Sequence, residues 1–172
     1  MDTELDLAYN HCQHVAKEHG KNFYYGFRML PYLKRRAIYA AYAFCRYCDD
    51  IADDDLPQEE KKRRLDHTRE LLTASWSGQA TNPLFAALVH ACHTFSIPDH
   101  YFQEVIEGVE MDLSWTRFQN FDQLYTYCYK VASSVGLICI EIFGYEDRKV
   151  LDYAVDFGVA MQLTNIIRDI RE

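Results

Sequence analysis

The chain has 172 residues, the length of one domain or of part of one, and its composition of 49% hydrophobic and 26% charged residues is that of a folded globular protein. The net charge of −8 argues against a nucleic-acid partner, because the overall field would repel phosphate backbones. Apolar runs fall short of the roughly 18 residues that a membrane span needs, and the acidic start at Met1–Glu4 lacks a signal-peptide pattern. We therefore expect a cytoplasmic protein whose six cysteines remain thiols.

Apolar residues recur with helical periodicity along nearly the whole chain, and no stretch alternates as a strand would. The predicted helices cover residues 3–19, 32–54, 58–75, 83–95, 99–113, 121–142 and 147–171. Each of the four prolines lies at or just before a predicted start. The charged run Glu59–Arg64 is interpreted as a solvated helix face. These features predict a single all-α domain over 1–172, and because no stop signal precedes Glu172, we expect it to be the N-terminal part of a longer domain.

One face of the helix predicted at 32–54 is polar although its flanks are apolar. At about 100° per residue, four side chains fall within an arc of about 60°: Tyr42, Arg46, Asp49 and Asp53. Aspartates crowd the C-terminal end of this helix, where the helix dipole makes each carboxylate cost about 0.3–1 kcal/mol. A bound cation would offset that cost, and carboxylate ligands without paired His or Cys indicate Mg²⁺ or Mn²⁺. The alternative is a solvated acidic turn, which is our interpretation of Asp54 and Asp55.

The last predicted helix has a second polar stripe. Gln162, Asn165 and Asp169 lie on one face of it, and Arg168 stands on the adjoining face. Burying such side chains without partners would cost about 1–3 kcal/mol each, so they need either a hydrogen-bonded core network or a shared site. Two stripes in one short chain favour a polar site between facing helices of a bundle.

Acidic faces with Arg and Lys nearby suit a diphosphate bridged by Mg²⁺, because this ion is usually held by one or two carboxylates together with substrate phosphates. Aromatic residues make up 15% of the chain. If a diphosphate leaves an allylic carbon, aromatic faces stabilise the remaining carbocation by about 0.5–2 kcal/mol each and exclude water.

Four motifs in the expected order resemble the squalene/phytoene synthase family, and the likeness covers essentially the whole chain. The first aspartate motif is C-R-Y-C-D-D-I-A-D at 45–53, and the second begins as Q-L-T-N-I-I-R-D at 162–169. Between them lie E-G-V-E-M-D-L at 107–113 and Y-T-Y-C-Y-K-V-A-S-S-V-G at 125–136. The resemblance implies an isoprenoid-synthase-type helical bundle around a central cavity, incomplete at its C-terminal end, that condenses two prenyl diphosphates head to head through a cyclopropyl diphosphate.

The resemblance also implies roles for individual residues. Metal and diphosphate would be bound by Asp49, Asp53 and Asp169. Phosphate charge would be neutralised by Lys21, Arg46 and Arg168, while Gln162 and Asn165 line the site. Tyr42 and Tyr127 would lie near the reacting carbons. The substrate entrance would be formed by His19, Asn22, Phe23 and Tyr24. The pocket floor would be formed by Phe27, Val131 and Val135.

Two departures from the family pattern matter. The family often has serine where Gly20 and Asn22 stand, so the N-terminal diphosphate contact must use an amide and backbone N–H groups. The second motif needs another aspartate four residues after Asp169, beyond Glu172, so we expect this chain by itself to be inactive or nearly so.

Several alternatives stay open. The stretch Ile138–Tyr145 is similar to bacterial presqualene diphosphate synthases, which use two C15 farnesyl units; the alternative is a phytoene synthase using two C20 geranylgeranyl units. A non-catalytic helical interaction module derived from the enzyme is a further alternative. A di-iron bundle is disfavoured because no Glu-x-x-His pair is present. No nucleotide-binding motif supports a reductive step with NADPH. Lipid products are compatible with loose association of the protein with a membrane surface. The sequence does not indicate the oligomeric state.

Overall fold

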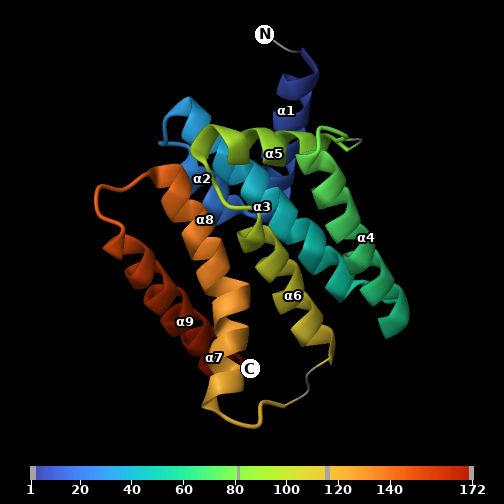
Figure 1. Cartoon of the computed structure of the whole chain (residues 1–172), viewed down its shortest axis with the longest axis vertical. Helices are drawn as coiled ribbons and strands as arrows, with labels where there is room; N and C mark the ends of the chain where they lie inside the picture. The colour runs from blue at the N-terminus through green and yellow to red at the C-terminus, as the bar shows by residue number, and fades with distance from the viewer. Residues whose placement is uncertain (1–2, 81, 115–116, 171–172) are drawn as a thin grey trace. The chain divides into compact units, whose positions relative to one another are not determined.

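The computed structural model describes residues 3–80, 82–114 and 117–170, which form helices and no strand (Figure 1). This confirms the all-α prediction. The chain divides into two compact units, Met1–Ile97 and Pro98–Glu172, and each is described by itself.

The first unit contains five helices: α1 (Thr3–His19), α2 (Lys21–Phe27), α3 (Tyr32–Asp53), α4 (Gln58–Trp76) and α5 (Pro83–Phe95). Pro31 and Pro57 precede α3 and α4, and Asn82 caps α5 by accepting a 2.9 Å hydrogen bond from the Leu84 N–H. α1, α3 and α5 pack against one another, and α4 packs on α3 and α5. Phe44 and Phe85 are fully buried between them, so α3 is anchored in the core.

The second unit contains α6 (His100–Ser114), α7 (Phe121–Cys128), a π-helical segment η1 (Tyr129–Ser133), α8 (Ser134–Phe143) and α9 (Lys149–Asp169). α7, η1 and α8 run on as one helix, with α9 packed beside it (Figure 1). Its core includes Phe102, Ile106, Ile138 and Ile142. The predicted helix at 121–142 is therefore one continuous element, but its winding changes in the middle.

Two glycines let neighbouring helices approach the π-helical segment closely. A Cβ at Gly158 of α9 would lie 2.6 Å from Ser133 Cα, and one at Gly108 of α6 would lie 2.8 Å from Val131 Cγ1. The Ser133 hydroxyl donates a 2.7 Å hydrogen bond to the Val155 carbonyl of α9. Wider turns of this kind occur mostly as local insertions in α-helices, frequently at functional sites.

Two expectations need correction. The short helix α2 was not predicted, because its seven residues, Lys21–Phe27, are too few for helical periodicity to identify. The helix at Phe121–Phe143 is long and apolar enough to cross a membrane by length and composition, contrary to the expectation that no such run exists. Only 33% of its most apolar window is buried, but helices that pack in a protein core pass the same test, so this is weak support for a membrane span. The last residue of the helix predicted at 147–171 lies outside the described residues.

Candidate active site

The polar stripe of α3 lies at the surface of its unit. Asp49 and Asp53 are exposed, whereas Tyr42 and Arg46 are half-buried. The Arg46 guanidinium forms a 2.5 Å ion pair with Asp50, one turn further along the helix. Its Nε is buried, however, and has no hydrogen-bond partner within the described part of the chain. A buried donor without an acceptor is costly, so this face of α3 is suited to an anionic ligand.

The segment after α1 packs against the Tyr42 end of this stripe. The rings of Phe23 and Tyr42 lie 5.9 Å apart, and those of Phe23 and Phe27 lie 5.7 Å apart. A Cβ at Gly20 would lie 2.6 Å from Tyr42 Cζ and 2.7 Å from its hydroxyl oxygen. A serine at position 20 would therefore displace the tyrosine ring, which gives a physical reason for the glycine that departs from the family pattern.

The structure thus brings Phe23 and Phe27 to the α3 stripe. His19, Lys21 and Asn22 are exposed on the adjoining turn, and Tyr24 stacks against Tyr39, with ring centroids 5.4 Å apart. Burial raises the pKa of Tyr42, with nearby Arg46 opposing the shift, so its hydroxyl remains protonated at neutral pH.

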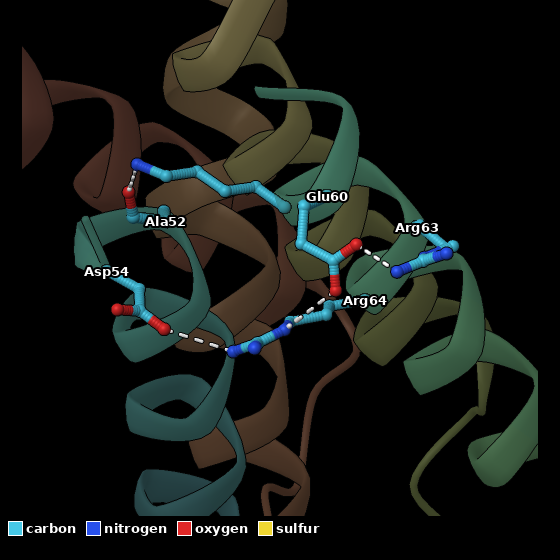
Figure 2. Close-up of polar contacts among 6 residues, drawn as sticks. Ala52, Asp54, Glu60, Arg63 and Arg64 are labelled. Atoms are coloured by element: carbon cyan, nitrogen blue, oxygen red, sulfur yellow. Dashed lines mark hydrogen bonds and ion pairs between the residues drawn. The ribbon is translucent and has the colours of Figure 1, made fainter. Parts of the chain in front are cut away.

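Basic side chains of α4 meet the acidic end of α3. Arg64 forms a 3.0 Å ion pair with Asp54, and Glu60 links Arg64 to Arg63 (Figure 2). Lys61 Nζ donates a 2.6 Å hydrogen bond to the Ala52 carbonyl in the last turn of α3.

These contacts correct two interpretations. The run 59–64 is more than a solvated face, because Lys61 and Arg64 reach the neighbouring helix. Asp54 is ion-paired rather than a freely solvated turn residue, so part of the electrostatic cost at this helix end is met by the protein itself. Asp53, by contrast, forms no ion pair with any residue that the structure describes.

The stripe of α9 belongs to a hydrogen-bonded cluster in the second unit. Gln162 and Asn165 are half-buried, and Asn165 Nδ2 donates a 3.3 Å hydrogen bond to Gln162 Oε1. Burial of Tyr127, together with its hydrogen bond to the Asp112 carboxylate, raises the pKa of the tyrosine, and a hydrogen bond from Gln162 opposes the shift. Asp112 of α6, Tyr127 of α7 and Gln162 of α9 therefore meet at the Tyr127 hydroxyl.

Asp112 is a member of this cluster that the spacing of the two polar stripes does not indicate. Its position in the D-L end of the 107–113 motif is the sequence signal that could have assigned it to this cluster. Glu107 forms an ion pair with Lys130 of η1, which links α6 to the π-helical segment. Val131 and Val135 are half-buried, and Val131 packs over Gly108.

Asp169 and Arg168 are both exposed and form a 2.9 Å ion pair with each other. Arg168 is thus directed at Asp169 along the same helix. The α3 and α9 stripes belong to different units, and the prediction that they share one site stays a prediction.

No group of three or more His, Cys, Asp or Glu side chains is gathered as a metal cage among residues 3–80, 82–114 and 117–170. Asp49 and Asp53 lie one turn apart on α3 and are both exposed. Two carboxylates at this spacing fit Mg²⁺ if oxygens of a diphosphate and water complete the shell, since the ion is usually bound in that way.

The squalene/phytoene synthase family model matches residues 16–172. A phytoene synthase of Mycobacterium tuberculosis is 39% identical over 170 residues, which are 99% of this chain and 56% of the relative. A phytoene synthase of Arthrospira platensis is 34% identical over 178 residues, covering 96% of this chain and 58% of the relative. This chain spans just over half the length of the curated relatives that it matches.

Solved structures show the same likeness. A squalene synthase of Alicyclobacillus acidocaldarius superposes with a TM-score of 0.90 and 29% identity, over 99% of this chain and 64% of that one. A dehydrosqualene synthase crystallised with a ligand gives a TM-score of 0.85 and 30% identity, over 96% and 57% of the two chains. The family match over residues 16–172 and this shared all-helical isoprenoid synthase fold establish that the chain belongs to the squalene/phytoene synthase family.

Proposed function

We propose that the protein condenses two prenyl diphosphates head to head, and that both are C20 geranylgeranyl diphosphate, so that the product is phytoene. The reaction type is supported by the α3 face, where the unpartnered Nε of Arg46 lies beside exposed Asp49 and Asp53. The chain length is supported by the curated relatives reported above, which are phytoene synthases. They favour the C20 alternative over the C15 reading that the stretch Ile138–Tyr145 suggested.

On this proposal the α3 stripe receives the leaving diphosphate. Arg46 binds it through the guanidinium, whose buried Nε then gains an acceptor. Asp49 and Asp53 would hold Mg²⁺, which would supply positive charge to the leaving diphosphate. Lys21 on the neighbouring turn adds a further cation.

Aromatic rings beside the stripe protect the carbocation that remains. Phe23 and Tyr42 pack together next to Arg46 and present π-faces, which attract a cation and keep water away. Burial keeps Tyr42 and Tyr127 protonated, so they offer hydroxyl dipoles and no anion that would trap the cation covalently. Gln162 and Asn165 hold Tyr127 in its orientation from α9.

The C20 reaction is balanced without an added reductant. A carbon–carbon bond joins C1 of the two prenyl units by way of the cyclopropyl diphosphate, and each unit loses one diphosphate and one proton. The C15 route to squalene needs a hydride donor in addition.

Presqualene diphosphate formation from two farnesyl units is a second candidate, supported by the likeness to a squalene synthase structure at a TM-score of 0.90. Stopping at that intermediate needs no reductant, because only one diphosphate and one proton leave. The two candidate functions differ in the length of the pocket that must hold the prenyl chain, which is longer for C20 than for C15.

The test uses the purified protein, in the longest form that its gene encodes, with Mg²⁺ and either farnesyl or geranylgeranyl diphosphate. We expect a C40 hydrocarbon by mass spectrometry from the C20 substrate alone. Presqualene diphosphate from the C15 substrate alone would overturn the proposed chain length. No product, and no Mg²⁺-dependent diphosphate binding by calorimetry, would indicate the non-catalytic module.

Two variants separate the site from its surroundings. Asp53→Asn should lower turnover by about 10²–10³-fold, whereas Asp55→Asn, which removes the same charge from the exposed turn two residues later, should not. Equal loss in both variants would contradict a specific role for the α3 stripe.

A further inference from the structure

Charge is distributed very unevenly along the chain. Between residues 21 and 48 there is no aspartate or glutamate, although the whole chain has 26 of them. The same stretch contains six of the 18 lysines and arginines. It covers α2, the α2–α3 connection and most of α3, so one corner of the first unit is basic in a protein that is acidic overall.

Part of this basic corner surrounds a cavity of about 440 Å³ between α1, α2 and α3. The cavity is lined by three cations, three tyrosines and a glutamine: Lys17, Arg28, Arg35, Tyr24, Tyr25, Tyr39 and Gln13. Neither Phe23 nor Tyr42 is among its lining residues. No carboxylate is among the lining residues, so the cavity is positively charged and attracts anions.

The three cations have no acidic partner among residues 3–80, 82–114 and 117–170. Arg35 donates a 3.0 Å hydrogen bond to the Arg28 carbonyl, and Tyr39 donates a 2.9 Å hydrogen bond to the Tyr24 carbonyl. These bonds fix the cavity wall before any ligand arrives. The remaining N–H groups of Arg35, with Lys17 and Arg28, can converge on phosphate oxygens.

Large apolar side chains protrude from the same corner. The exposed fractions are 60% for Tyr25, 90% for Met29, 59% for Tyr32 and 53% for Leu33. Tyr25 also lines the cavity, and the Arg35 guanidinium lies 5.9 Å from the centroid of the Tyr32 ring. Aromatic and apolar side chains interleaved with Lys and Arg are the composition of protein surfaces that insert into the headgroup region of a bilayer.

From this juxtaposition we infer that the α2–α3 corner docks on a membrane that contains anionic lipids. The cavity takes a lipid phosphate between Lys17, Arg28 and Arg35, while Met29 and Leu33 enter the acyl boundary. The occupant is a lipid surface because a soluble phosphate would explain the cations but not the exposed apolar residues around them. The inference concerns a surface outside the α3 stripe and does not require the proposed condensation.

The experiment measures flotation of the protein with vesicles of phosphatidylcholine alone and of phosphatidylcholine mixed with phosphatidylglycerol. We expect binding to the mixed vesicles that weakens as salt is raised. At about 1 kcal/mol for each cation near an anionic surface, Arg28→Gln/Arg35→Gln should lower the partition coefficient about 10- to 30-fold. The charge-matched control Lys62→Gln/Arg63→Gln, on α4, should leave it nearly unchanged.

The apolar contribution is tested with Met29→Ser/Leu33→Ser, which should lower binding to the mixed vesicles at high salt as well as low. Leu7→Ser, at a residue of α1 that is 63% exposed, is the matched control. Equal binding by the wild type and both double variants would overturn the inference, and so would equal losses in the test and control variants.

Two further results would assign the corner to another occupant and overturn membrane docking. The first is that calorimetry detects binding of inorganic phosphate to the wild type but not to Arg28→Gln/Arg35→Gln, while this variant binds vesicles as well as the wild type does. The second is that gel filtration shows a dimer of the wild type and a monomer of Met29→Ser/Leu33→Ser. Because no catalytic readout is involved, failure of this inference and failure of the proposed reaction are distinguishable.

Discussion

Replacing Gly158 by alanine tests how closely α9 approaches the π-helical segment of the second unit. The new methyl group would lie 2.6 Å from Ser133 Cα and 2.7 Å from its backbone N, and neither atom can move without the helix. α9 must therefore shift away from η1. The shift also lengthens the 2.7 Å hydrogen bond from Ser133 to the Val155 carbonyl.

The expected cost follows from three contributions. Overpacking against backbone costs about 1–3 kcal/mol, and weakening the Ser133 hydrogen bond costs up to about 1 kcal/mol more. The higher helix propensity of alanine offsets about 1 kcal/mol of this. We expect the free energy of unfolding to fall by up to about 3 kcal/mol, and α9 to carry Gln162 away from Tyr127.

The assay is urea unfolding followed by circular dichroism. Gly136→Ala is the control in the same unit, because its methyl group would meet only the Ala154 carbonyl at an ordinary 3.5 Å. The free energy of unfolding of Gly136→Ala should rise by up to about 1 kcal/mol, because alanine has a higher helix propensity than glycine. If Gly158→Ala proved as stable as Gly136→Ala, the close approach of α9 to η1 would be refuted.

Three further predictions concern the two stripes. Asp53→Asn should lower turnover by about 10²–10³-fold while raising the free energy of unfolding by about 0.3–1 kcal/mol, because a carboxylate is removed from the negative end of a helix; steady-state kinetics and urea unfolding check this. Lys61→Met should cost about 1 kcal/mol by removing a charged donor from the last turn of α3, whereas Lys62→Met on the solvated side should be neutral in the same unfolding assay. Because the pKa of Tyr127 is raised in the folded state, its contribution to stability is complete below about pH 10, the unfolded value, and is lost as pH rises further. In unfolding experiments above pH 10, Tyr127→Phe should therefore lose stability less steeply than the wild type.

Most helices could be predicted because proline and apolar periodicity agree. Pro31, Pro57 and Pro83 stand at the starts of α3, α4 and α5, where a missing N–H does no harm. α2 could not be found in this way, since its seven residues are too few for helical periodicity to identify. The π-helical segment was also hidden, because one additional residue in a turn leaves the apolar pattern of a long helix nearly unchanged.

The polar residues of each stripe could be read from helical spacing, but their partners could not. Nothing in the spacing indicates that Tyr127 meets Asp112, because the two are on different helices and the contact depends on tertiary packing. The same holds for Gly20, whose lack of a side chain has meaning only beside the ring of Tyr42. Charge runs were the least informative signal, since Lys61 and Arg64 reach α3 while Lys62 remains exposed.

The two cations that α4 places at the end of α3 bear on the order in which the protein assembles. Since Lys61 and Arg64 already counter the acidic helix end, α3 can fold before any divalent ion is encountered. On the proposed function, the ion would then be bound together with the diphosphate of the substrate. A chelator should accordingly stop turnover and leave the melting temperature unchanged, in contrast to small metalloproteins that unfold when stripped of their ion.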